Sequence, residues 1–178
     1  MLQKLLPAFI AALLTGCSAP TDTRWNAGVT SGYGIGDRIV IPTTVHIGCE
    51  LNEPLGIDKN LGTLTLNLEA YHHRFIAPET GSLIGAAPML RYSYPLGDFS
   101  PYLEGGAGPG YLTIRTKEQG PPGFNFLDQG GFGIDYHIDD LTFTLGYRCS
   151  HISHARLRNG PNGGIDEHII RFGLSIDF

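Results

Sequence analysis

Charged residues are scarce in this sequence, and their balance is acidic. Only 16% of the 178 residues are charged, and 12 Lys and Arg residues are outnumbered by 17 Asp and Glu residues. A nucleic-acid-binding domain normally carries a basic face that neutralises phosphates. A net charge of −5 provides no such face, so we expect no nucleic-acid partner.

The sequence also lacks long amphipathic helical patterns, internal repeats, low-complexity blocks and long linkers. Without such features, a chain of 178 residues suits one domain. Its 25 glycines and its aromatic residues instead accompany short segments of alternating polarity, which are typical of β-strands. The composition therefore indicates a single all-β domain.

Spacings that suit a metal site are absent as well. His72 and His73 are adjacent, so their side chains face opposite sides of a strand and cannot share one metal ion. His46, His137 and His168 stand apart from other candidate ligands. We therefore expect neither a metal nor any other cofactor.

Cysteine occurs only three times, and Cys17 closes an N-terminal segment typical of export. Residues 1–16 contain one Lys and then an apolar stretch too short to span a membrane as a helix. The letters LTGC resemble the lipobox of bacterial lipoproteins, whose Cys is diacylated, and the following Ser18 favours sorting to the outer membrane. The alternative is an ordinary signal peptide with a Cys near its cleavage site. We predict a lipoprotein-type signal peptide over 1–16, a lipid anchor on Cys17 and a tether over 17–23.

The sequence alone does not determine whether the other two cysteines, Cys49 and Cys149, are oxidised. An exported chain with two cysteines can form a disulfide. Both residues, however, fall on the apolar side of strand-like segments, and nothing in the sequence makes them neighbours. We expect free thiols at both positions.

Strand-like segments recur eight times between turn signals. They cover roughly 24–35, 37–51, 61–76, 82–95, 99–115, 124–138, 140–153 and 166–178. Eight strands is the smallest common size of a membrane β-barrel, and an even number is usual for bacterial single-chain barrels. We predict that residues 24–178 form one domain, an all-β, eight-stranded antiparallel transmembrane β-barrel of the outer membrane.

The alternation along the last segment suits a barrel in lipid. One face carries Ile170, Phe172, Leu174, Ile176 and Phe178, and the other carries Glu167, Ile169, Arg171, Gly173, Ser175 and Asp177. A soluble sandwich or a periplasmic calycin-like barrel would also alternate, with the apolar face inward. The small or charged residues of the polar face suit a narrow lumen, and the terminal Phe resembles the C-terminal signature of outer-membrane barrels. These two features favour the membrane barrel.

Polar residues interrupt the apolar face where the seventh segment ends. Its alternation puts His151 and Ser153 on the outward face, about 6.5–7 Å apart along the strand. The same count on the eighth segment turns Asp166 outward and Glu167 inward. Because the two segments are consecutive and antiparallel, Asp166 is expected beside His151 and Ser153. A nucleophile, a base and a carboxylate that orients the base are the components of a Ser–His–acid hydrolase.

The topology of an even-stranded barrel sets the depth of these three residues. With both termini in the periplasm, the seventh strand runs outward and the eighth returns, so they lie at the extracellular end. In a Gram-negative outer membrane, the leaflet at that end is lipopolysaccharide, whose lipid A carries ester-linked acyl chains. We therefore expect lipid A, in the outer membrane, to be the partner and substrate.

The segment HISHARLRNGPNGGID resembles the signature of the lipid A 3-O-deacylase (PagL) family, whose members have His-x-Ser-Asn-Ala followed by Asn-x-Gly-Ile-Glu. Upstream, AAPMLRYSY, SPYLEGGAGPG and FNFLDQGGFG are similar to that family's strands four to six. The resemblance covers roughly residues 60–178. It implies an eight-stranded outer-membrane barrel that hydrolyses the ester at the 3-position of lipid A.

Carried over by position, the resemblance implies three catalytic roles. His151 is the expected general base, Ser153 the nucleophile, and Asp166 the acidic member. Asn162 matches the family's later Asn, and with His154 it is a candidate for positioning or for stabilising the oxyanion.

Two arginines of the same segment are candidates for substrate binding. Arg156 and Arg158 lie in the extracellular loop, where guanidinium groups can contact lipid A phosphates. Ordinary solvated loop charges are the alternative.

The sequence departs from the family pattern at three points. Asp166 replaces a Glu and is one methylene shorter, so its reach to His151 is open. His154 replaces the Asn that follows the serine, a residue proposed to help stabilise the oxyanion. One extra residue lies between Ala155 and Asn162.

Two other classes of function stay open. The changes at His154 and Asp166 support a non-catalytic barrel, either structural or adhesive, or a deacylase homologue without activity. A periplasmic lipid-binding lipoprotein would instead have an apolar interior. The sequence fixes neither the preferred acyl chain nor the oligomeric state, so a homodimer also stays open.

Overall fold

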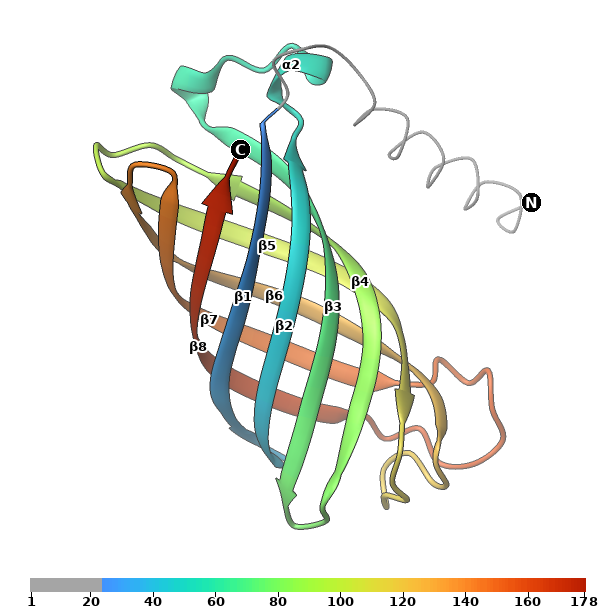
Figure 1. The fold of residues 1–178 in the computed structure, drawn as a ribbon. Coiled ribbons are helices and arrows are strands. Elements are labelled where there is room, and N and C mark those ends of the chain that lie inside the picture. Colours follow the sequence, from blue (N-terminus) through green and yellow to red (C-terminus); the bar gives the residue numbers. More distant parts are fainter. Residues whose placement is uncertain (1–23) are drawn as a thin grey trace, which may run out of the picture.

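Eight antiparallel strands form a closed barrel. The computed structural model describes residues 24–178, so the predicted signal peptide (1–16), the lipid anchor at Cys17 and the tether (17–23) lie outside the described residues. The strands pair in chain order, and the first pairs with the last. Figure 1 shows them winding around one tall barrel, with their tilt visible along its wall. The predicted eight-stranded barrel is confirmed.

The strands begin and end within three residues of the predicted positions. They are β1 (Trp25–Gly36), β2 (Ile39–Glu50), β3 (Thr63–Ala77), β4 (Gly81–Ser93), β5 (Phe99–Leu112), β6 (Gly123–Ile138), β7 (Leu141–Ser153) and β8 (Ile165–Asp177). A short helix, α2 (Asn52–Leu55), and a 3₁₀ turn, η1 (Lys59–Leu61), lie between β2 and β3.

Among residues 24–178, the structure contains no helix long and apolar enough to cross a membrane.

Alternation along the strands separates an apolar exterior from the barrel interior. On β8, Ile170 and Phe172 are exposed, whereas Glu167 and Arg171 are buried. The exposed apolar surface continues around the barrel with Val29, Val45, Leu68, Ile84, Leu103, Ile134 and Leu145. An apolar outer face is what lipid requires, and it excludes the soluble sandwich, whose apolar faces would point inward.

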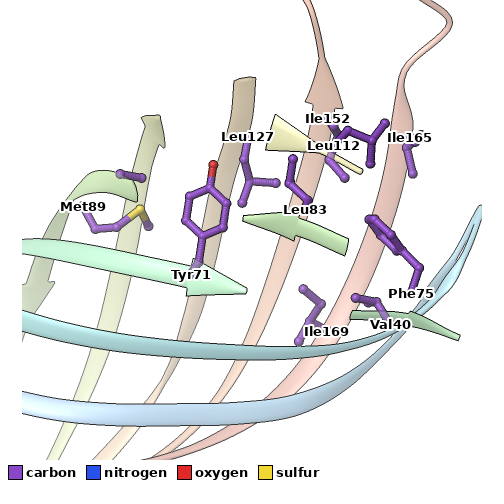
Figure 2. Close-up of a cluster of buried hydrophobic side chains, with 11 residues drawn as sticks. Val40, Tyr71, Phe75, Leu83, Met89, Leu112, Leu127, Ile152, Ile165 and Ile169 are labelled. Carbon is purple, nitrogen blue, oxygen red and sulfur yellow. The ribbon is translucent and has the colours of Figure 1, made fainter. Parts of the chain in front are cut away.

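An apolar cluster closes one end of the interior. Its side chains come from β2 to β8, and we call this cluster, shown in Figure 2, the apolar plug. It comprises Val40, Tyr71, Phe75, Leu83, Ala87, Met89, Leu112, Leu127, Ile152, Ile165 and Ile169. The plug lies mainly at the end opposite the termini, which is the end predicted to be extracellular. The alternation predicted mainly small or charged interior residues, and the plug differs because this part of the interior is sealed from water.

A network of buried charges fills the interior next to the plug. The guanidinium of Arg148 contacts the Glu69 carboxylate at 2.7 Å and the Glu104 carboxylate at 2.6 Å. Arg91 and Arg171 also contact Glu104. Beyond this network, a polar cavity of about 320 Å³ lies at the end of the barrel that holds the termini. The plug therefore fills one end of the interior, and the ionic network fills the part between the plug and this cavity.

The two cysteines of the barrel differ in their state. Cys149 is a free, exposed thiol on the outer face, as predicted. Cys49 is buried and disulfide-bonded, so the prediction of a free thiol is wrong at that position. Strand alternation predicts that both side chains point to the outer face. It does not predict that Cys49 is buried there while Cys149 is exposed.

Candidate active site

The predicted base and acid face each other across β7 and β8. His151 pairs directly with Asp166, and both side chains lie on the exposed outer face. The Nδ1 atom of His151 is 2.6 Å from the Asp166 Oδ1 atom. The shorter side chain of Asp166 therefore reaches the imidazole, which settles the first departure from the family pattern.

The predicted nucleophile lies next to this pair on the extracellular side. Ser153 is the last residue of β7, on the same face as His151, and it is half-buried. Within residues 24–178, neither the Ser153 hydroxyl nor the His151 Nε2 atom has a hydrogen-bond partner. Catalytic hydrogen bonds are often long before substrate binds, so two unpartnered groups at this spacing suit a nucleophile and its base.

Gly164 supports the imidazole from the loop side. A side chain at this position would overlap the His151 ring, and the backbone φ of +83° is one that L-residues rarely adopt. Sequence reasoning did not single out Gly164. The adjacent glycines before β8 mark a turn, but nothing in the sequence places that turn beneath an imidazole.

Asn162 and His154 are brought together, although His154 does not point at the ester site. The Oδ1 atom of Asn162 accepts a hydrogen bond of 2.8 Å from the His154 main-chain N–H. The His154 ring is buried, with its Nε2 atom 2.8 Å from the Pro161 carbonyl oxygen. The ring therefore holds the loop together, while the Asn162 side chain reaches the residue that follows Ser153 despite the extra loop residue.

The sequence of the barrel matches the model of a known protein family. The family model described as lipid A 3-O-deacylase (PagL) matches residues 49–175. The chain belongs to the PagL family. The match runs from the end of β2 into β8 and includes His151, Ser153 and Asp166. Membership places the barrel in the bacterial outer membrane, as predicted.

Solved structures share the fold of this PagL-family barrel. The outer membrane enzyme PagL matches with a TM-score of 0.61 and 21% identity, over 83% of this chain and 97% of that one. Neisserial surface protein A matches with a TM-score of 0.59 and 13% identity, over 89% and 98%. At these identities, the likeness establishes the fold alone. No curated protein sequence matches the chain.

The two loop arginines of this PagL-family protein have different surroundings. Arg158 donates hydrogen bonds to the carbonyl oxygens of Gln119 at 3.1 Å and Pro121 at 2.9 Å. Its guanidinium therefore joins the β7–β8 loop to the β5–β6 loop, and both of its terminal nitrogens bond to main-chain carbonyls of the protein. Arg156 is exposed. Of the two predicted phosphate contacts, only Arg156 has its guanidinium in the open.

A second ion-pair group ties the other extracellular loops together. Arg38 is buried between the loops and contacts the carboxylates of Glu79 and, at 2.9 Å, Glu118. Partial burial raises the pKa of the Glu118 carboxyl, but hydrogen bonds from its own main chain and from Arg38 outweigh this, so the pKa lies below its ordinary value. The extracellular loops thus form a connected layer above the site.

Asp128 is a polar residue of the site to which the sequence assigned no role. It lies on β6 directly opposite His151, so the imidazole stands between Asp128 and Asp166. All three side chains line one hollow of about 410 Å³ on the outer face, together with Cys149 and others. The signal was present in the sequence, because Asp128 breaks the apolar alternation of its strand.

Proposed function

We propose that this protein is an active lipid A 3-O-deacylase that uses Ser153, His151 and Asp166. The observation that carries the proposal is the 2.6 Å contact between His151 and Asp166, beside an unpartnered Ser153 on the lipid-facing surface. The side chains of His151 and Asp166 are 46% and 66% exposed on that surface, so the substrate reaches them from the membrane. Membership in the PagL family supports the same reaction.

The reaction proceeds by acyl transfer in two steps. His151 takes the Ser153 proton through Nε2 while the serine oxygen attacks the ester carbonyl. The tetrahedral intermediate then releases the sugar hydroxyl, which receives that proton from His151, and an acyl-serine remains. Water, activated by the same imidazole, releases the fatty acid.

Asp166 fixes the orientation of the base. Its contact with Nδ1 makes that nitrogen the one that carries the proton, so Nε2 is left as the basic nitrogen facing Ser153. The carboxylate also stabilises the imidazolium that forms during each step. This contribution requires an acid on the outward face of β8, where Asp166 lies.

Asn162 is the side-chain candidate for the oxyanion donor. Its Oδ1 atom accepts from the main chain of His154, which fixes the amide plane beside Ser153. Within the part of the chain that the structure describes, its Nδ2 group has no partner, so it is available to a developing oxyanion. Loss of one such donor typically slows an acyl-transfer enzyme by about 10²–10³-fold.

The lipid anchor at Cys17 belongs to this proposal. The LTGC sequence supports it, and an acylated Cys17 would attach the N-terminal tether to the inner leaflet of the same membrane. An acylated Cys17 has no thiol left to pair with the disulfide-bonded Cys49, so this anchor and a disulfide between the two residues exclude each other. Metabolic labelling with palmitate tests it. We expect label on the protein and none on a Cys17→Ser variant, and an unlabelled wild type would refute the anchor.

Mass spectrometry of lipid A from producing cells tests the catalytic proposal. We expect lipid A to lose one 3-hydroxyacyl group when the protein is present and to stay unchanged with the Ser153→Ala variant. Both proteins should migrate as folded, heat-modifiable barrels on gels. Unchanged lipid A in the presence of folded wild-type protein would favour a non-catalytic barrel instead.

A further inference from the structure

A second polar group faces the lipid on β3 and β4, away from the proposed active site. Along β3, His72 and Arg74 alternate outward with Leu68 and Ile76, and these side chains are exposed. Arg74 pairs directly with Ser82 of β4. An arginine on the lipid face of a barrel costs free energy that rises steeply towards the middle of the bilayer. Arg74 therefore suits the level of polar headgroups or a position beside an anionic partner.

The strand register sets the depth of Arg74 relative to the proposed active site. Followed from His151 through β6, β5 and β4, the pairing reaches β3 at Leu68. Followed the other way, through β8, the β1–β2 turn and β2, it reaches the last residues of β3. Both routes cross equally many strands, and they end at different points because the strands of a barrel are tilted. The level of His151 therefore lies midway between these points, beside His72 and Arg74, on the opposite side of the barrel.

The side chains around Arg74 offer hydrogen-bond donors without acceptors. His72 Nε2 lies 2.8 Å from Ser82 Oγ. In either tautomer, one proton of this pair is used in that bond and another, on Nδ1 or on Oγ, is left to donate. The Thr113 hydroxyl accepts from the Ser82 main-chain N–H at 2.9 Å. Within residues 24–178, neither the Thr113 hydroxyl proton nor the Arg74 guanidinium has an acceptor. We call His72, Arg74, Ser82 and Thr113 the outer-face donor group.

The barrel wall supplies no acid to this donor group. Among the described residues, the outward positions of β3 and β4 hold no Asp or Glu. Glu79, in the hairpin between these strands, pairs with Arg38. The matching acceptor is therefore an oxyanion from outside the chain, and a phosphate suits the planar fork of a guanidinium best.

Apolar neighbours indicate that this phosphate belongs to a lipid. Ile41 pairs with Arg74 and Ile84 pairs with His72, and both isoleucines are exposed on the outer face. A ligand that covers them must carry apolar chains beside its phosphate. Lipid A has this chemistry, because its phosphates are on the sugars that bear the 3-O-linked esters. Its phosphates therefore lie near the level of the proposed active site.

We propose that the outer-face donor group binds the phosphate of a lipid A molecule that is not the substrate. Arg74 supplies the charge, while Thr113 and the His72–Ser82 pair donate further hydrogen bonds. The acyl chains of this lipid lie against Ile41, Ile84 and the apolar wall below them. The inference does not depend on the proposed function, since the donor group lies across the barrel from Ser153.

Native mass spectrometry of the purified protein in detergent tests the inference. The probe is bisphosphorylated lipid A whose 3-O-linked acyl chains have been removed, so that no ester is left there to react. We expect Arg74→Gln to bind the probe about 10-fold more weakly than the wild type, because a charged donor is lost. Thr113→Val keeps the shape of the side chain and should weaken binding about 3-fold. After both phosphates are removed from the probe, all three proteins should bind it equally.

Two controls separate this lipid from other sources of affinity. Lys117→Gln removes one exposed positive charge from the β5–β6 loop, and we expect it to leave binding unchanged. A bulky maleimide on Cys149, the free thiol in the hollow beside His151, obstructs the proposed active site. We expect the effect of Arg74→Gln to persist in the alkylated protein. Heat-modifiable migration shows that each protein is folded.

Three results would overturn the inference. If Arg74→Gln binds the probe as tightly as the wild type, the donor group does not hold the phosphate. If Lys117→Gln weakens binding as much as Arg74→Gln, the attraction comes from overall charge. If the effect of Arg74→Gln disappears after alkylation of Cys149, the lipid lies at the proposed active site. None of these results bears on whether Ser153 hydrolyses an ester, so the deacylase proposal is tested separately.

Discussion

At the scale of single residues, two neighbouring acids on β8 have separate tasks. Asp166 points outward to the His151 imidazole. Glu167 points inward, where it is fully buried and its Oε2 atom lies 2.8 Å from the Ser150 hydroxyl and 2.9 Å from His73 Nδ1. Because successive side chains of a strand face opposite sides, neither acid can take the place of the other.

Amide substitutions should separate these tasks. We expect Asp166→Asn to fold normally and to lower kcat by about 10³–10⁴-fold, since the orienting carboxylate is lost. Glu167→Gln should keep most of the rate but lower the free energy of unfolding by about 1–3 kcal/mol, because a buried network loses its charged acceptor. Deacylation assays and urea unfolding measure the two effects. A Glu167→Gln barrel that folds but loses as much rate as Asp166→Asn would contradict this assignment.

At the scale of elements, the strands were predictable from the sequence and the loops were not. A period of two identifies the outward face of every strand, so it placed His151, Ser153 and Asp166 on one surface. Turn signals gave the strand ends within three residues. The loops follow no such period, so neither the inward turn of His154 nor the carbonyl contacts of Arg158 could be derived. The apolar plug was also missed, because alternation does not report what fills an interior.

In the β7–β8 loop, a substitution at Gly164 tests whether the loop holds the His151 ring in place. We expect Gly164→Ala to slow deacylation by about 10²-fold, because the added methyl overlaps the His151 ring and the backbone has a positive φ. Gly160 is the matched control, since it also has a positive φ, of +119°, but no atoms around its missing side chain. Comparable activity losses in Gly160→Ala and Gly164→Ala, measured by fatty-acid release, would mean that backbone strain and not contact with His151 is responsible.

At the scale of the whole molecule, the residues that stabilise the barrel lie inside its wall, and the residues of the proposed active site lie on its outer face. The same strands that carry His151 and Asp166 outward carry Arg148 and Arg171 inward, into the ionic network. The plug and the network stabilise the barrel from its interior, so polar side chains on the outer face are not needed for its stability. The site therefore faces the lipid without opening a path through the barrel.

Removal of one charge from the interior should weaken the barrel without altering the site. Glu69 has Arg148 as its ion-pair partner among residues 24–178, so Arg148→Met leaves the Glu69 carboxylate buried and uncompensated. We expect the free energy of unfolding in urea to fall by about 3–5 kcal/mol. Addition of Glu69→Gln removes the unpaired charge and should restore part of that loss.

The same variants show whether the interior influences catalysis. Under conditions where heat-modifiable migration shows a folded barrel, Arg148→Met should release fatty acid at close to the wild-type rate, because Arg148 points away from the lipid-facing surface. The double variant with Glu69→Gln should do the same at higher urea concentrations. A folded Arg148→Met barrel that had lost its deacylase activity would mean that the network positions β7, and the separation of stability from chemistry would be wrong.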